Sequence, residues 1–356
     1  MSIFRVIGER VVSEPEFLAR DEVLAETARA QDSAGTAALA RGPITGSGAT
    51  PEFRAVGKGR PLQVVIDHVY TGKHPKRGGL FGRRADMAVL SGVKDYSVFA
   101  ASTRALNLLS EDVEPRSHLR GSAFQDGTPL VLYSPAVMTD SLTLTIELAA
   151  DTFDGELFSK VASGFSTAAG IPLMLPHSGY LLGVGELLKL AGGLGDALFD
   201  SRPAFSITET LNFGLPGRPL AVADHWLLTH EPNLHDYSYD PAIGLRDSAG
   251  APYSGDEPYV VITLDGGERA ELNAFTPTAA SAAVLQRFLS MKDGAATSVD
   301  TLIEAIRLAS DLKLRGRAET LKQRIATVND PKAKEALQKE LDAIIKNIGN
   351  EVLRPD

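Results

Sequence analysis

A stretch of 25 residues without a charged side chain, from Val161 to Gly185, constrains the fold of this chain more than any other feature. Charged residues make up 23% of the sequence, so a run of this length must be hidden from water, either in a core or in lipid. Pro172, Pro176 and His177 interrupt the run, and an unbroken membrane helix there would leave backbone groups unsatisfied. The sequence therefore favours a loop and helix packed on a sheet, with conditional membrane insertion as the alternative.

Six leucines in and just after this run are the candidates for core or membrane contact. They are Leu173, Leu175, Leu181, Leu182, Leu187 and Leu188. Leu187 and Leu188 belong to a segment of helical character, which Gly192, Gly193 and Gly195 weaken. We expect the whole segment 161–199 either to pack in the core or to be released by cleavage or a partner.

Composition bounds the class of protein. The 356 residues are 44% hydrophobic and include no cysteine, which excludes disulfides, thiolate metal sites and cysteine nucleophiles. The first residues, MSIFRVIGERVV, lack the apolar region of a secretory signal peptide, so we expect a cytoplasmic protein. The net charge of −9 argues against general nucleic-acid binding.

Periodicity and composition divide the chain into four parts. Residues 1–32 are expected to form a helical segment, and 33–61, rich in Gly, Ala, Thr and Pro, a linker or loop. Residues 62–278 are expected to form a β-sandwich-like domain with a helical insertion at about 154–200, and residues 279–356 a helical region. The predicted fold class is α+β, mainly an antiparallel β-sandwich with a C-terminal helical hairpin or bundle.

The candidate strands are rich in β-branched residues, or they alternate apolar with polar residues. The clearest is 141–148, where Leu142, Leu144, Ile146 and Leu148 lie on one face. The others are 62–70, 86–92, 96–102, 129–134, 205–213, 220–228 and 259–265. The turn Asp265-Gly266-Gly267 predicts a hairpin from the last of these to a further strand at 269–275.

Three helices and a short fourth are predicted in the C-terminal region. The short one spans 281–291, and a capping-box pattern at 297–300 opens the next, which is followed by a helix around Leu321 and Ile325. In the last helix Asp330 suits the N-cap and Pro331 the first position. Its apolar stripe, which would pack on this chain or pair with a partner helix, consists of Leu337, Leu341, Ile344, Ile345 and Ile348.

A basic loop follows the strand 62–70. The window from Phe53 to Arg84 carries a charge of +7, which leaves −16 for the rest of the chain. Such a loop suits phosphates, an anionic lipid surface or an acidic partner, but it lacks the Walker A pattern. The residues expected to bind are Lys73, Lys76, Arg77, Arg83 and Arg84.

Catalytic signatures are weak. His225, His230 and His235 lie five residues apart beside Asp224, Glu231 and Asp236, which is a poor spacing for a metal site because strand residues five apart point to opposite faces. We therefore treat the three histidines as weak metal candidates and predict no cofactor. No nucleophile elbow is present.

One stretch resembles a C2 domain, a β-sandwich module used at membrane surfaces. LQVVIDHVYTGK is similar to its opening strand and turn, Asp86 stands where the family has an aspartate leading into a strand, and SLTLTIELAADTFDGELF is similar to its strand followed by an Asp-rich loop. The likeness covers about residues 62–158. Where calcium-binding members place acids in the first loop, this chain has Lys73, Lys76 and Arg77, so the resemblance implies a calcium-independent interaction module.

Three functions follow as hypotheses. The first is a non-catalytic binding or assembly protein, acting through protein partners or self-association. The second is a membrane-acting effector in which residues 161–199 are released by cleavage or a partner. The third is a metal-dependent hydrolase that uses the 224–236 His/Asp cluster.

Overall fold

The computed structural model describes residues 2–7, 9–19, 53–74, 85–94, 103–120, 129–151, 204–216, 218–269, 272 and 299–355. The elements in these ranges are β1 (Ser2–Ile7), β2 (Arg10–Ser13), β3 (Leu62–Tyr70), β4 (Ala85–Lys94), β5 (Thr103–Val113), β6 (His118–Arg120), β7 (Leu130–Ser134), β8 (Ser141–Asp151), β9 (Phe205–Asn212), β10 (Asp224–Thr229), β11 (Ser238–Asp240), β12 (Gly244–Arg246), β13 (Tyr259–Asp265), α5 (Val299–Thr327), α6 (Pro331–Asn347) and the 3-10 turn η3 (Glu351–Leu353). The residues outside the described ranges include the uncharged run, the six candidate leucines in and just after it, the predicted strand 96–102 and the predicted helix 281–291.

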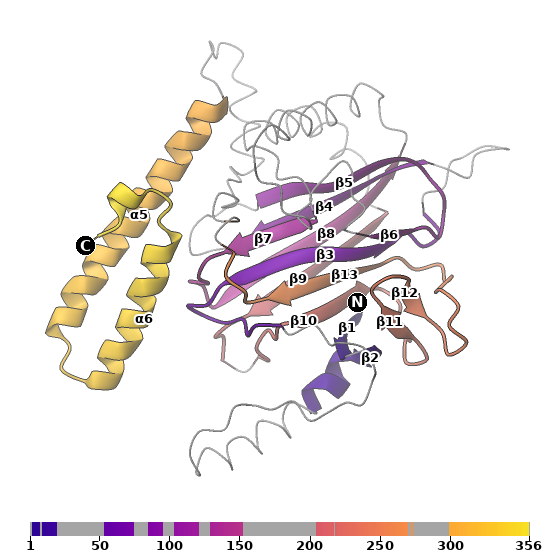
Figure 1. Cartoon of the computed structure of the whole chain (residues 1–356), viewed down its shortest axis with the longest axis horizontal. Coiled ribbons are helices and arrows are strands. Elements are labelled where there is room, and N and C mark those ends of the chain that lie inside the picture. The colour runs from indigo at the N-terminus through magenta and orange to yellow at the C-terminus, as the bar shows by residue number, and fades with distance from the viewer. Residues whose placement is uncertain are drawn as a thin grey trace.

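The described strands form two antiparallel sheets. The larger runs in the order β12–β11–β2–β1–β10–β13–β3–β6, with β7 also paired to β3, and the smaller runs β5–β4–β8–β9 (Figure 1). The predicted strands at 62–70, 86–92, 129–134, 141–148, 205–213 and 259–265 are confirmed, and the strand expected at 220–228 begins at Asp224. The fold is therefore mainly antiparallel β, followed by two C-terminal helices.

Apolar side chains from the two sheets share one core. Ile66 and Ile262 from the larger sheet and Val89 and Ile146 from the smaller are completely buried in it. Burial alternates along β8 with the predicted period of two, because successive side chains of a strand point to opposite faces. A second cluster, containing Tyr239 of β11, covers the other face of the larger sheet.

The N-terminal residues differ from the prediction. Residues 1–32 were expected to be helical, but β1 and β2 add two strands to the larger sheet, and helical conformation begins only at 14–19. β1 pairs with β10 from Ser2↔Thr229 to Val6↔His225. Strands this short acquire stability from the distant partner, which no local pattern reveals.

The predicted hairpin after β13 is wrong. The structure describes two residues of the predicted strand 269–275. Arg269 lies outside any strand, and Leu272 is in a 3-10 turn. The chain leaving β13 instead meets the segment before β3. The Arg54 N–H donates to the Asp265 carboxylate at 2.8 Å, and the Gly266 N–H donates to the Arg54 carbonyl at 2.9 Å.

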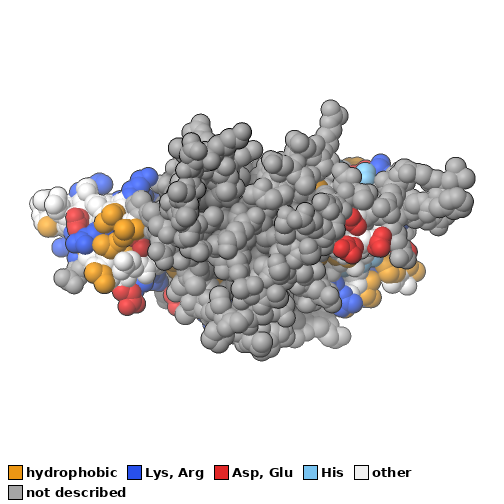
Figure 2. Space-filling model, turned by 90° about the horizontal axis from the view of Figure 1, so that it is seen from above, with side chains coloured by type: hydrophobic (Ala, Val, Ile, Leu, Met, Phe, Trp, Pro, Cys, Tyr) orange, Lys and Arg blue, Asp and Glu red, His pale blue; other side chains and the backbone are white. Residues whose placement is uncertain are grey.

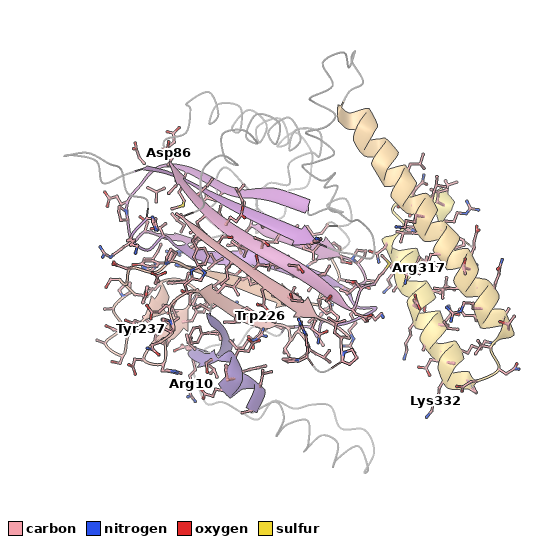
Figure 3. All side chains as sticks on the ribbon, turned by 180° about the vertical axis from the view of Figure 1, so that it is seen from behind. Arg10, Asp86, Trp226, Tyr237, Arg317 and Lys332 are labelled. Atoms are coloured by element: carbon pink, nitrogen blue, oxygen red, sulfur yellow. The ribbon has the colours of Figure 1, made fainter. Side chains whose placement is uncertain are left out.

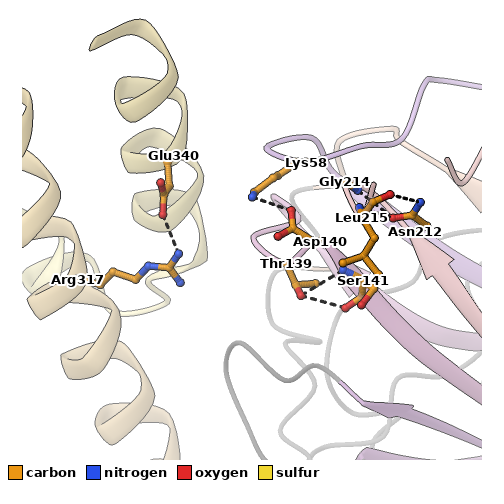
Figure 4. A network of polar contacts seen from close by, with 9 residues as sticks. All are labelled: Lys58, Thr139, Asp140, Ser141, Asn212, Gly214, Leu215, Arg317 and Glu340. Atoms are coloured by element: carbon orange, nitrogen blue, oxygen red, sulfur yellow. Dashed lines mark hydrogen bonds and ion pairs between the residues drawn. The ribbon is translucent and has the colours of Figure 1, made fainter. Parts of the chain in front are cut away.

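The C-terminal helices form a hairpin that stands beside the β-sheets (Figures 1 and 3). The two helices predicted between 297 and 328 are one continuous helix, α5, of 29 residues. α6 begins as predicted, since the Asp330 side chain accepts a hydrogen bond from the Lys332 N–H and Pro331 follows it. Arg317 and Glu340 join the two helices through an ion pair of 2.7 Å (Figure 4).

Candidate functional site

The start of the predicted basic loop is held firmly to the β-sheets. Lys73 is described, whereas Lys76, Arg77, Arg83 and Arg84 lie outside the described residues. The Lys73 N–H donates to the Asp256 carbonyl at 2.9 Å, and the Arg116 N–H donates to the Gly72 carbonyl at 2.6 Å. The Arg116 guanidinium also pairs with the Asp256 carboxylate at 2.6 Å. The loop therefore leaves the sheet from a fixed base.

The apolar stripe of α6 packs within the chain. Leu341, Ile344 and Ile348 are buried and Leu337 and Ile345 half-buried, against three residues of α5. Those residues are Leu314, Ala318 and Leu321. Of the two uses that the sequence left open for this stripe, packing on the same chain is the one observed, and a partner would need another surface of the hairpin.

The three histidines considered for a metal site have different neighbours in the structure. His225 lies on β10 and contacts Asp67 and Thr263, whereas the ring of His230 packs on Phe205 with centroids 5.0 Å apart. Exposed His235 lies in the following loop. Within the described ranges, no group of three or more His, Asp or Glu side chains is arranged to hold a metal.

Asp67, His225 and Thr263 form a polar cluster on three neighbouring strands. The ladder between β3 and β13 shifts register beside Asp67, so this residue occupies a β-bulge that turns its carboxylate toward β13. His225 Nδ1 lies 3.2 Å from the Asp67 carboxylate and 2.7 Å from the Thr263 hydroxyl, which donates to the same carboxylate. Because both partners meet the same imidazole nitrogen, the cluster lacks the geometry of a nucleophile relay, in which acid and nucleophile occupy opposite nitrogens.

A histidine and tyrosine cluster lies on the same face of the larger sheet. His68 Nε2 lies 3.1 Å from His118 Nδ1, and His118 Nε2 lies 3.2 Å from the Tyr253 carbonyl oxygen. The Tyr259 hydroxyl accepts the Leu245 N–H at 2.9 Å and lies 3.5 Å from His118 Nδ1. These contacts join β3, β6, β12 and β13 at one point.

Burial sets the protonation of this cluster. It lowers the pKa of His68 to about 3, with His118 and Arg120 adding smaller repulsion. Burial also lowers the pKa of His118 and raises that of Tyr259. All three groups are therefore neutral at neutral pH, because a charged form would have to be desolvated.

A buried arginine lies at the edge between the two sheets. Arg5 is 2% exposed, its guanidinium carbon is 3.0 Å from the Trp226 ring centroid, and it pairs with Glu14 at 3.5 Å. Glu14 also affects a second carboxyl group, that of Glu209. Burial, with a smaller contribution from the charge of Glu14, raises the pKa of Glu209 to about 7. The guanidinium is thus held by ring stacking and an ion pair rather than by a complete set of hydrogen bonds.

A scan against protein-family models and searches of curated proteins and of solved structures return no match for this chain. Within the described residues, neither α5 nor α6 has the uninterrupted apolar length that crossing a bilayer requires. The function must therefore be inferred from the geometry of the residues themselves.

The sequence prediction missed the residues with the richest polar chemistry. His68 and His118 are 50 positions apart, and His118 and Tyr259 are 141 apart. His68 stands beside Asp67 in a largely apolar strand, and a buried structural histidine has the same kind of surroundings in a sequence. Only the strand order, which places β3 between β13 and β6, brings the three side chains together.

Proposed function

We propose that this protein is a non-catalytic assembly protein whose C-terminal hairpin pairs with the hairpin of a second copy. One observation carries the proposal: Leu308 and Leu312 of α5 are 47% and 51% exposed although they lie only one helical turn apart. Val352, just after α6, is 86% exposed. Figure 2 shows hydrophobic side chains among Lys and Arg at the end of the molecule where the hairpin lies.

The face of α5 that carries these leucines is not the face used inside the hairpin. Packing on α6 involves Leu314, Ala318 and Leu321. Apolar side chains at helical spacing on an exposed helix are typical of a surface that another helix covers. Each leucine is already about half buried, so complete burial would add roughly half of the 1.5–3 kcal/mol of a fully exposed side chain. Two leucines on each copy would still stabilise the pair by several kcal/mol before the entropy of association is subtracted.

The charges along α5 favour a second copy in antiparallel orientation. Residues 299–310 contain two acids and one base, whereas 311–327 contain two acids and five bases. Antiparallel pairing therefore places the acidic beginning of one helix against the basic end of the other, and Leu308 against Leu312 of the second copy. A two-fold interface of this kind is self-complementary.

We further propose that the two sheets form a C2-like sandwich that presents this hairpin. Asp86 and Asp151, two of the three aspartates on which the resemblance depends, are cross-strand partners on β4 and β8. The third, Asp154, lies outside the described residues. The shared core between the sheets also supports this arrangement. Lys73, Lys76 and Arg77, which stand in place of the acids of the first loop, favour an interaction module without calcium.

Sedimentation velocity over a range of protein concentrations tests the assembly proposal. The wild-type chain is expected to form a dimer whose population rises with concentration, and Leu308→Glu and Leu312→Glu are each expected to sediment as monomers. Leu220→Glu is the matched control, because Leu220 is 58% exposed but lies outside the hairpin. A wild-type monomer at every concentration, or a Leu312→Glu variant that still dimerises, would refute the proposal.

A further inference from the structure

Three atoms able to bind a metal converge where β3, β6 and β13 meet. His68 Nε2 and His118 Nδ1 are 3.1 Å apart, and the Tyr259 hydroxyl oxygen is 3.5 Å from His118 Nδ1. Ligand atoms at the corners of a tetrahedron around Zn²⁺, each about 2.0–2.1 Å from the ion, are about 3.3 Å apart. We propose that His68, His118 and Tyr259 form a binding site for a divalent transition-metal ion of the kind that prefers imidazole, Cu²⁺ or Zn²⁺.

The backbone of Gly244 packs directly against two of the three atoms. A Cβ added to Gly244 would lie closer than 3.0 Å to both the Tyr259 hydroxyl oxygen and His68 Nε2. These two atoms therefore border the same small volume, and the φ of +91° at Gly244 is one that residues with a Cβ rarely adopt. Glycine at this position keeps a side chain from intruding between these two atoms.

A backbone contact orients the His118 imidazole as metal ligands are oriented. His118 Nε2 faces the Tyr253 carbonyl oxygen at 3.2 Å, so an N–H there donates to the carbonyl and leaves a lone pair on Nδ1. Metal-binding histidines commonly donate their second N–H to a backbone carbonyl in this way. The Leu245 N–H, 2.9 Å from the Tyr259 oxygen, likewise fixes the phenol.

The protons balance within the cluster. In the metal-free state one of the two facing nitrogens carries the proton, and the orientation of His118 assigns it to His68 Nε2. Binding an ion moves that proton to His68 Nδ1, a buried atom with no hydrogen-bond partner among the described residues. The imidazoles then release no proton, and Tyr259 releases one only where it binds as the phenolate.

The site differs from the one that the sequence suggested. It uses none of His225, His230 and His235, and its third ligand is a tyrosine, which a search for His and acidic residues passes over. It is also independent of the assembly proposal, because these strands contain none of the exposed hairpin leucines. His118 is half-buried, so the ion reaches the site from that side.

Calorimetric titration of the full chain, after treatment with a chelator, tests the site with CuSO₄ and ZnCl₂ separately. We expect one equivalent of Cu²⁺ to bind, with Zn²⁺ weaker, in keeping with the usual order of affinities. His118→Asn is expected to weaken binding by at least about tenfold, whereas His235→Asn, a change at an exposed histidine, leaves it unaltered. Equal affinity of the wild type and His118→Asn, or no stoichiometric binding to the wild type, would overturn the proposal.

Two further variants keep the test sharp if His118→Asn folds poorly. Gly244→Ala retains all three ligands but fills the space between them, and we expect it to lose binding. Tyr259→Phe retains both histidines and should abolish any phenolate-to-copper absorption band. If Gly244→Ala is folded by circular dichroism and still binds Cu²⁺ like the wild type, the ion does not occupy this space and the assignment fails.

Discussion

Gly72 shows how one residue fixes the base of a loop. Its φ is +59°, and a Cβ there would clash with the Asp256 carbonyl and approach the Pro258 nitrogen to 2.7 Å. All of these neighbours are backbone atoms, which cannot rotate away. The residue therefore combines an unusual backbone conformation with a close approach of two chains, and both require glycine.

Gly72→Ala is expected to lower the free energy of unfolding by at least about 2 kcal/mol, because strain and steric clash add. Gly59→Ala is the matched control. Gly59 also has a positive φ, +76°, but nothing lies within 4 Å of an added Cβ, so only the conformational cost of about 1 kcal/mol applies. Urea unfolding of both variants measures the difference, and equal losses would contradict the close packing at Gly72.

Glu209 gives a pH dependence whose sign can be worked out. Its pKa rises from 4.5 to about 7 on folding, mainly through burial. The folded state therefore binds the proton more tightly than the unfolded state, and stability is lost as the pH rises from about 4.5 to 7. The full effect is at most about 3.5 kcal/mol, at about 1.4 kcal/mol for each pKa unit, and solvent screening of the partly exposed carboxyl makes it smaller.

Glu209→Gln removes this titration. Relative to the wild type, the variant should gain stability as the pH is raised from 5 to 7, and the gain should level off above about pH 7. Melting temperatures of both proteins across this range provide the test, and the comparison cancels the contributions of all other groups. A constant difference between the two curves would show that Glu209 titrates normally.

At the scale of elements, α5 shows packing overriding a local signal. Gly316 lies in the middle of the helix and costs about 1 kcal/mol relative to alanine. The sequence predicted two helices here, one opened by the capping-box pattern at 297–300 and one around Leu321 and Ile325. The chain nevertheless continues as one helix because Leu314, Ala318 and Leu321, on either side of the glycine, pack against α6.

Gly316→Ala is expected to stabilise the hairpin by about 0.4–1 kcal/mol. An added Cβ would meet nothing within 4 Å, so no packing is disturbed. Hydrogen exchange of the α5 amides should slow, whereas exchange in the β-strands should stay the same. Faster exchange in α5 would mean that the glycine serves a close contact absent from the described residues.

At the scale of the whole molecule, the side chain of Asn347 helps to connect the hairpin to the β-sheets. Asn347, the last residue of α6, donates from Nδ2 to the Ala136 carbonyl at 2.7 Å and to the Ala343 carbonyl at 2.8 Å. Met138 packs against the hairpin core beside it. Lys346 adds an exposed ion pair of 3.3 Å with Glu268.

Asn347→Ala is expected to loosen the hairpin at a cost of about 1–3 kcal/mol, because the Ala136 carbonyl loses its partner in a half-buried place. Lys346→Ala, which removes only the exposed ion pair, should cost less than about 1 kcal/mol. Limited proteolysis compares the two variants, with cleavage in the hairpin expected to accelerate for Asn347→Ala alone. Equal behaviour would show that the apolar contact of Met138 holds the hairpin.

Much of the fold could be predicted because its signals are local. The period of two in β8 and the cap of α6 need only neighbouring residues, and both are confirmed. The strand β1 and the course of the chain after β13 depend on partners far along the sequence. The helix predicted at the N-terminus and the hairpin predicted after β13 are therefore wrong. The charged loop was visible in the sequence, but its fixed base on Asp256 was not.

The sequence by itself determined the strands with alternating residues, the last helix and the absence of any cysteine chemistry, because each depends on residue types at short spacing. The tertiary structure decided which distant residues meet. Only antiparallel pairing places His68 beside His118 and Tyr259, and only the packing of α6 on α5 uses up one apolar face and leaves Leu308 and Leu312 exposed. Such juxtapositions arise from the free energy of burying whole surfaces, which no short pattern encodes.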